Sequence, residues 1–238
     1  QAKVEWSRGN LPAADTAMEA LATEAEQLDA KRVLAMVLHD RSGVARDRGD
    51  LPRAIRLGYD AFTRTADEFE RERVLADLAN YLSVYGAMES AADALRALEI
   101  TARSADLRWL TQINLLSLAV RTTNEVMFQH YRRTLSVTAL PTRIEIDFLL
   151  ELGKGCTHFG MYSDARAALS SGLRTAEDIG ANQQVFVFEE LVSTLDLAER
   201  EAREERLVRA NRPEQHAAPD DIATALRELL SEVSGAAA

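Results

Sequence analysis

The chain has 238 residues, of which 47% are hydrophobic and 6% aromatic, enough to bury a large core, so disorder is not the default expectation. Strong helix formers dominate the composition and Gly and Pro are few, which predicts an all-α fold. The 38 acidic and 28 basic residues give a net charge of -10, which disfavours the binding of nucleic acid through this segment.

The chain starts at Gln1 inside what reads as the end of a helix (Val4, Glu5 and Trp6), as expected of a fragment whose first helix is partly missing. Its single cysteine, Cys156, can form no internal disulfide, which fits a reducing compartment. No apolar run approaches the roughly 18 residues of a membrane span. We therefore expect a soluble, cytoplasmic protein without a membrane partner.

One pattern then recurs along the chain: Gly, any residue, a large apolar residue, two mostly polar residues and Ala. It occupies residues 9–14, 49–54, 86–91 and 160–165, and a degenerate copy with Asn in place of Gly occupies 124–129. Successive copies start 36 to 40 residues apart. A second anchor, a Thr-Ala pair, recurs farther along the blocks at Thr65, Thr101, Thr138 and Thr175, with Glu24-Ala25 at this place in the first block. Two anchors that recur together indicate an internal repeat.

Each part of the pattern has a physical reason. Gly or Asn tolerates the left-handed conformation that ends a helix, and Pro12 and Pro52 suit the first turn of the next helix. The small Ala lets neighbouring helices approach closely. Each block is therefore predicted to be a helix–turn–helix, and stacking of about five such pairs would bury the apolar faces that one pair leaves open.

After the repeats, residues 199–206 read as a solvated, mixed-charge end of the last helix. We expect a repeat domain over 1–210, a linker over 211–219 and a C-terminal helix and tail over 220–238. The last helix has an apolar stripe that requires cover. It either caps the last repeat or docks onto another copy or a partner.

The blocks resemble the tetratricopeptide repeat family. The closest copy has Leu152-Gly153 seven residues before Gly160, where the family has a Leu-Gly pair, and Ala165 at the family's small position. The resemblance covers about residues 1 to 200 and implies a right-handed α–α superhelix. The repeats are longer than the family's roughly 34 residues and lack its Pro. They are similar in this to the degenerate arrays beside helix-turn-helix domains in bacterial transcriptional regulators and other signalling proteins.

In such a superhelix the first helix of each pair lines the concave face. The groove should therefore contain the residues that stand three, six and ten positions before each Gly anchor, and some residues one turn farther back. Asn side chains there can bind peptide backbone, and Arg or Lys can bind carboxylates. The alternative is that these are ordinary solvated residues. In the family, Asn at the place of Asn80 binds backbone or a terminal carboxylate, but Gly43 and Leu118 stand at the matching places of adjacent repeats. The candidate partner-binding residues are His39, Arg46, Arg73, Asn80, Ser83, Asn114, Arg121 and Lys154.

The sequence predicts no enzyme, no cofactor and no metal site. Cys156 and His158, two positions apart on one helix, diverge too far to form a nucleophile–base pair, and Cys156 falls at a core position. The four histidines show no metal-ligand spacing. The Gly-Lys-Gly of residues 153–155 resembles part of a phosphate loop, but it lacks the earlier Gly, the Ser or Thr after Lys and the preceding strand.

The leading hypothesis is therefore a scaffold that binds a protein or peptide and serves as a regulatory or sensory module of a larger bacterial signalling or transcription-regulatory protein. The alternative is a structural module for self-association, as in a homodimer. Light scattering separates the two hypotheses, because a monomer at all concentrations counts against self-association.

Overall fold

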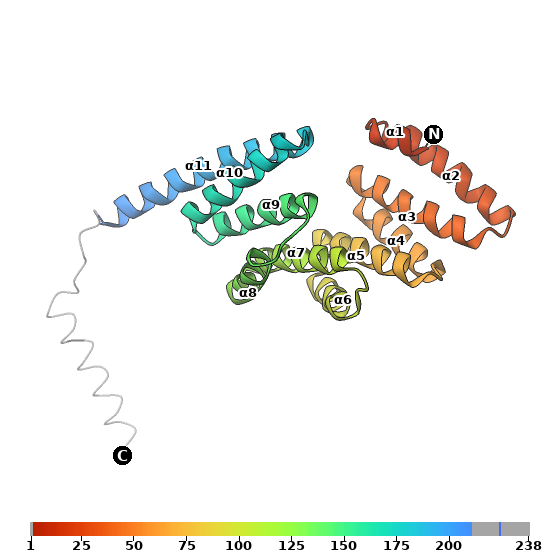
Figure 1. Cartoon of the computed structure of the whole chain (residues 1–238), viewed down its shortest axis with the longest axis horizontal. Coiled ribbons are helices and arrows are strands. Elements are labelled where there is room, and N and C mark those ends of the chain that lie inside the picture. Colours follow the sequence, from red (N-terminus) through yellow and green to blue (C-terminus); the bar gives the residue numbers. More distant parts are fainter. Residues whose placement is uncertain (1, 211–223, 225–238) are drawn as a thin grey trace, which may run out of the picture. The chain divides into compact units, whose positions relative to one another are not determined.

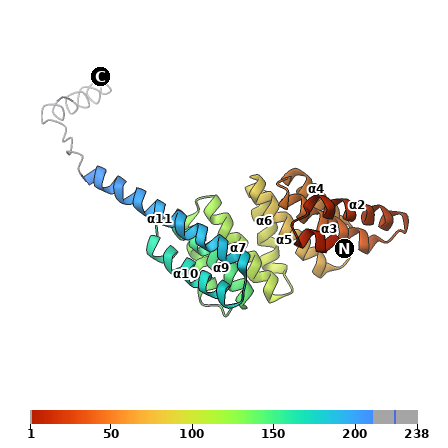
Figure 2. The ribbon, with the colours of Figure 1, turned by 90° about the horizontal axis from the view of Figure 1, so that it is seen from above.

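The computed structural model describes residues 2–210 and residue 224, and within them it consists of helices joined by short turns, without a strand. The helices are α1 (Ala2–Ser7), α2 (Leu11–Gln27), α3 (Lys31–Asp47), α4 (Leu51–Arg64), α5 (Glu68–Tyr85), α6 (Met88–Thr101), α7 (Ala105–Arg121), α8 (Glu125–Ser136), α9 (Thr142–His158), α10 (Tyr162–Asp178) and α11 (Asn182–Ala210). From α1 to α10, each helix packs against the next (Figures 1 and 2). The prediction of an all-α solenoid built from consecutive helix pairs is confirmed.

The contacts divide the chain into two units, Gln1–Leu195 and Asp196–Ala238, and α11 continues across this boundary. The linker predicted over 211–219 lies outside the described residues. So does the helix predicted over 220–238, apart from Thr224, which is helical. None of the helices that the structure describes is both long enough and apolar enough to cross a membrane.

The glycine anchors lie in the turn between the two helices of each pair. Gly9, Gly49, Gly86 and Gly160 have φ angles of 77°, 78°, 103° and 72°, which is the left-handed region expected from the sequence. The alanine five positions later is fully buried in all four of these pairs, at Ala14, Ala54, Ala91 and Ala165. The anchors therefore turn the chain, and the alanines let the paired helices approach.

The degenerate block is shifted by one residue from its predicted register. The left-handed residue is Thr123, with a φ of 50°, and not Asn124. Asn124 instead caps α8, because its Oδ1 accepts a hydrogen bond of 3.0 Å from the backbone N–H of Met127. Asn suits both the left-handed turn position and the N-cap of a helix. The identity of this residue therefore did not show where the block begins. In the corrected register Gly49, Gly86, Thr123 and Gly160 are evenly spaced, 37 residues apart.

The corrected register also places Phe128 where the other pairs have their buried alanine. Phe128 is fully buried and contacts the next first helix at Gly155, where an added Cβ would lie 2.1 Å from the ring atom Cε2. The absent side chain of Gly155 therefore accommodates the ring. Gly153 makes a similar close contact with Leu169 of α10, so the two glycines of α9 face opposite neighbours.

The recurring threonines have a local role at the ends of the second helices. In each of the four, the hydroxyl donates a hydrogen bond to the carbonyl oxygen four residues earlier: Thr65 to Ala61, Thr101 to Ala97, Thr138 to Thr134 and Thr175 to Ser171. The last carbonyls of a helix lack a partner along the backbone, so a hydroxyl at this place provides an additional donor.

An ion cluster around Asp15 joins the first two repeats. Asp15 of α2 is buried, and its carboxylate accepts two hydrogen bonds from Arg53 of α4 at 2.8 and 3.1 Å. Arg48 Nη1 lies 3.1 Å from the same carboxylate and Arg41 Nε 3.3 Å from it, and Arg41 also binds Glu19 at 2.8 Å. One buried carboxylate thus connects α2 to α3, to the following turn and to α4.

Candidate functional site

The first helices α3, α5, α7 and α9 together line a cavity of about 530 Å³. Direct packing of α5 on α7 and of α7 on α9 keeps these helices side by side. The apolar part of the lining consists of Ala76, Leu107, Leu110, Ile113 and Leu150. The polar part consists of Arg46, Arg73, Asp77, Asn80, Asn114, Ser117, Arg121, Asp147 and Glu151. Polar side chains from four helices thus make up most of the lining, with five apolar residues among them.

The structure brings five of the eight candidate residues together in this cavity, namely Arg46, Arg73, Asn80, Asn114 and Arg121. His39 lies outside it and lines a second cavity. Ser83 is buried, with 6% of its surface exposed, and lines neither cavity. Lys154 lines neither cavity and forms an ion pair of 2.7 Å with Glu151, which does line the first.

The corrected register of the fourth repeat explains part of this pattern. Six positions before Thr123 stands Ser117, which lines the cavity, whereas Leu118 is buried in the core. At the matching place in α3, Gly43 packs on Trp6, whose ring atom Cη2 would lie 2.5 Å from an added Cβ. The residue six positions before the anchor therefore lines the groove in α5, where it is Asn80, and in α7, where it is Ser117. In α3 it is Gly43, which α1 covers.

The charges of the cavity come in two groups. One consists of the guanidinium groups of Arg46, Arg73 and Arg121, and the other of the carboxylates of Asp77, Asp147 and Glu151. Removal from water and the neighbouring Glu151 raise the pKa of Asp147. Several of these groups already have partners, since Asp77 binds His39 Nε2 at 2.8 Å and Arg46 binds Asp47 at 2.7 Å. The charged pairs therefore give the wall a mixed potential and no net preference for either sign.

The amide side chains of Asn80 and Asn114 differ from these paired groups. Over residues 2–210, neither amide makes a side-chain hydrogen bond, and the guanidinium of Arg121 has no ion-pair partner. Asn80 and Asn114 lie on the adjacent helices α5 and α7 and open into the same cavity. Each amide offers a donor and an acceptor, which is the pair of groups that an extended backbone also presents.

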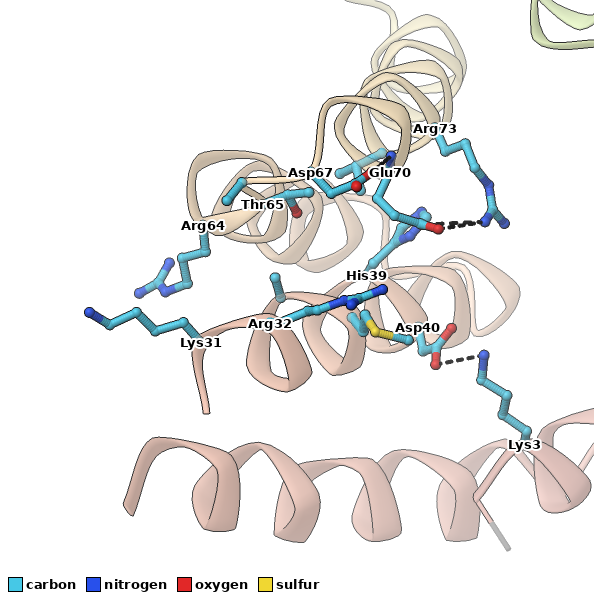
Figure 3. Close-up of a pocket in the computed structure, with 14 residues that line it drawn as sticks. Lys3, Lys31, Arg32, His39, Asp40, Arg64, Thr65, Asp67, Glu70 and Arg73 are labelled. Atoms are coloured by element: carbon cyan, nitrogen blue, oxygen red, sulfur yellow. Dashed lines mark hydrogen bonds and ion pairs between the residues drawn. The ribbon is translucent and has the colours of Figure 1, made fainter. Parts of the chain in front are cut away.

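A second cavity, of about 570 Å³, lies between α3 and the turn that joins α4 to α5 (Figure 3). Its lining includes His39, Met36 and Val74, together with several charged side chains. Arg73 lines both cavities, so the two are neighbours along α5. We call them together the inner groove.

Sequence reasoning missed several groove residues. Asp77 and Glu151 fall between the positions obtained by counting back from the anchors, and Ser117 was lost with the register of its repeat. Lys31, Arg32 and Arg64 lie near the turns between repeats, where no pattern had been sought. In the structure the turn before α3 contains Asp29, whose φ is positive like that of the glycines in the turns within the pairs.

Cys156 is fully buried, which confirms its predicted core position, and burial raises the pKa of its thiol to about 11. In the part of the chain that the structure describes, no three His, Cys, Asp or Glu side chains are placed to hold a metal ion.

The thiol of Cys156 is expected to be unreactive in the folded chain. At pH 8 a pKa of about 11 leaves about one thiol in a thousand ionised, and the fully buried sulfur is shielded from reagents. Labelling with a thiol-specific reagent should therefore be at least about a hundredfold faster in denaturant than in buffer. Rapid labelling of the folded chain would contradict the burial of this residue.

No protein-family model and no curated protein matches the chain. The geometry of the inner groove therefore carries the argument about function.

Proposed function

We propose that the chain binds a protein or peptide segment, in extended form, along the inner groove. The observation that carries the proposal is the pair of unpartnered amides, Asn80 and Asn114, which open from adjacent helices into one cavity. Two amides on neighbouring helices can each bind one peptide unit of an extended segment, which exposes all its backbone groups. The apolar residues of the lining support the proposal, because they offer contact area for side chains of the segment.

The resemblance of the blocks to tetratricopeptide repeats supports the same function, since such arrays are binding scaffolds. On that basis we further propose that the chain is a regulatory or sensory module of a larger bacterial signalling or transcription-regulatory protein, and that it works in the cytoplasm. We propose no catalytic role for the groove.

The proposal predicts that replacing both amides weakens peptide binding. A random peptide library displayed on phage, selected against the whole chain, would supply ligands without prior choice of sequence. For the selected peptides, the Asn80→Ala, Asn114→Ala variant should bind at least about fivefold more weakly, because each lost hydrogen bond contributes about 0.5 to 1.5 kcal/mol. Isothermal titration calorimetry measures the difference.

A matched control is the Gln27→Ala, Asn182→Ala variant. It also removes two amides, but both are exposed and lie outside the inner groove. Its affinity should equal that of the parent chain. Equal affinities of all three proteins would reject the assignment of the site. If the chain instead forms dimers as its concentration rises and selects no peptide, self-association is the better description.

A further inference from the structure

The second cavity of the inner groove is basic, in contrast to the chain as a whole. The chain has a net charge of -10, yet five cationic side chains line this cavity: Lys3, Lys31, Arg32, Arg64 and Arg73. Its acidic side chains are three, Asp40, Asp67 and Glu70. This local excess of positive charge attracts an anionic ligand that the remainder of the surface repels.

The three carboxylates are engaged within the structure. Asp40 forms an ion pair of 3.0 Å with Lys3, and Glu70 forms one of 3.3 Å with Arg73. Asp67 caps α5, since its Oδ1 accepts a hydrogen bond of 2.9 Å from the backbone N–H of Glu70. They therefore do not neutralise the cations at the other end of the cavity, where Figure 3 shows Lys31 and Arg64.

Lys31, Arg32 and Arg64 form what we call the basic cluster. Arg32 makes no ion pair or hydrogen bond through its side chain within residues 2–210. Lys31 lies 3.9 Å from Asp29, where both side chains are at least 80% exposed, and Arg64 lies 3.4 Å from Asp60 in the same helix. Exposed pairs of this kind contribute about 0 to 1 kcal/mol, so a ligand carboxylate can replace them.

Apolar atoms lie beside these charges. Ala35 and Val74 are buried in the wall, and the Met36 side chain between them and the solvent is 49% exposed. An unbranched thioether adapts to different apolar partners at low cost. The cavity therefore offers one apolar contact within reach of the basic cluster.

We propose that this end of the inner groove binds an acidic peptide segment that carries one apolar side chain. The carboxylates of the segment contact the basic cluster, and the apolar side chain packs on Met36. The inference rests on the proposed function and names the chemistry of its partner. A polyanion such as nucleic acid suits the chain less well, because its long phosphate backbone would extend beyond the basic cluster along a protein whose net charge is -10.

The probe is a fluorescein-labelled synthetic peptide with the sequence Gly-Asp-Glu-Leu-Asp-Glu-Gly, measured by fluorescence anisotropy against the whole chain. Binding should weaken at least about tenfold when the acidic residues are replaced by Lys, and severalfold when Leu is replaced by Ala. It should also weaken with added salt, because the contacts are exposed ion pairs.

Arg32→Glu is the decisive variant, because it reverses an unpaired, exposed charge and breaks no contact that folding requires. It should lower the affinity for the acidic probe at least about tenfold. Arg96→Glu is the matched control: Arg96 is also exposed, on α6, and pairs only with Asp93 at 3.6 Å. Its affinity should be within about twofold of the parent. Equal losses in both variants would contradict a local site.

The outcomes separate the inference from the proposed function. Peptides from the random library that depend on Asn80 and Asn114, but are not acidic and bind Arg32→Glu normally, would overturn the inference and leave the proposed function standing. A chain that binds no peptide at all overturns both. Binding of a single-stranded 20-mer oligonucleotide that is lost in Arg32→Glu, without binding of the acidic peptide, would identify a different ligand and reject the inference.

Discussion

The Asp15→Asn variant is expected to lose about 3 to 5 kcal/mol of stability, because it leaves buried positive charge without its counter-ion. Arg41, Arg48 and Arg53 all contact the Asp15 carboxylate, and the Arg41 and Asp15 side chains are only 9% and 12% exposed. An amide keeps the size of the side chain but carries no charge, and its NH₂ group cannot accept the hydrogen bonds of a guanidinium. The loss should concentrate in α2, α3 and α4, which the cluster joins.

Urea denaturation gives the change in stability, and hydrogen exchange of the backbone amides shows where it falls. Local measurement matters because helical repeats contact mainly their neighbours and can unfold in parts. Glu19→Gln is the matched control: it makes the same chemical change on the same helix, beside the same Arg41, but the Glu19 side chain is 65% exposed. It should cost less than about 1 kcal/mol. Similar losses in the two variants would show that the burial of Asp15 has no special effect.

The Gly155→Ala variant should destabilise the fold by about 2 to 3 kcal/mol, although alanine is the better helix former. The added methyl carbon would lie 2.1 Å from Phe128 Cε2 in a fully buried site, so the ring or the helix must move. The neighbouring Phe159, whose ring centre lies 5.0 Å from that of Phe128, restricts the movement of the ring. The midpoint of urea denaturation should fall accordingly.

Gly58→Ala provides the control for helix propensity. Gly58 is also buried within a helix, but an added Cβ would lie 3.4 Å from the nearest atom, Cδ1 of Leu78. This variant should be neutral or more stable by up to about 1 kcal/mol. Phe128→Leu, added to Gly155→Ala, should cost less than the sum of the single changes, because the smaller side chain makes room for the methyl group. Strict additivity would show that the two residues do not compete for the same space.

The ends of the helices could be predicted because their causes are local. Gly49 and Gly86 adopt the left-handed conformation that their sequence positions predicted, and Asp50, which follows Gly49, caps the next helix through a hydrogen bond of 3.1 Å to the backbone N–H of Arg53. At Thr123 and Asn124 the residue types alone did not show which of the two takes the left-handed conformation that ends α7. In the structure Asn124 caps α8, and Phe128 occupies the place of the buried alanine beside a glycine on another helix.

The candidate site was predicted in part. Asn80 could be found because the groove-facing side of a first helix follows from helical periodicity, whereas the count that chose Asn114 started from Asn124, one residue past the anchor Thr123. Ser83 and Lys154 were chosen by the same count, but Ser83 is buried and Lys154 is paired with Glu151, and neither lines the groove. The basic cluster could not be predicted, since Lys31 and Arg64 stand at opposite ends of one helix pair in the sequence and line the same cavity only once α3 and α4 have folded against each other.

By itself, the sequence determined that the chain is helical, where its helices turn and that they form stacked pairs, because propensity, turn residues and apolar periodicity act over a few neighbouring residues. Only the tertiary structure decided which charges are paired. Asp15 is surrounded by arginines from three segments, and Arg32 is left without a partner, although both are single charged residues in similar helical contexts. Pairing depends on distances between helices, and no local pattern encodes those distances.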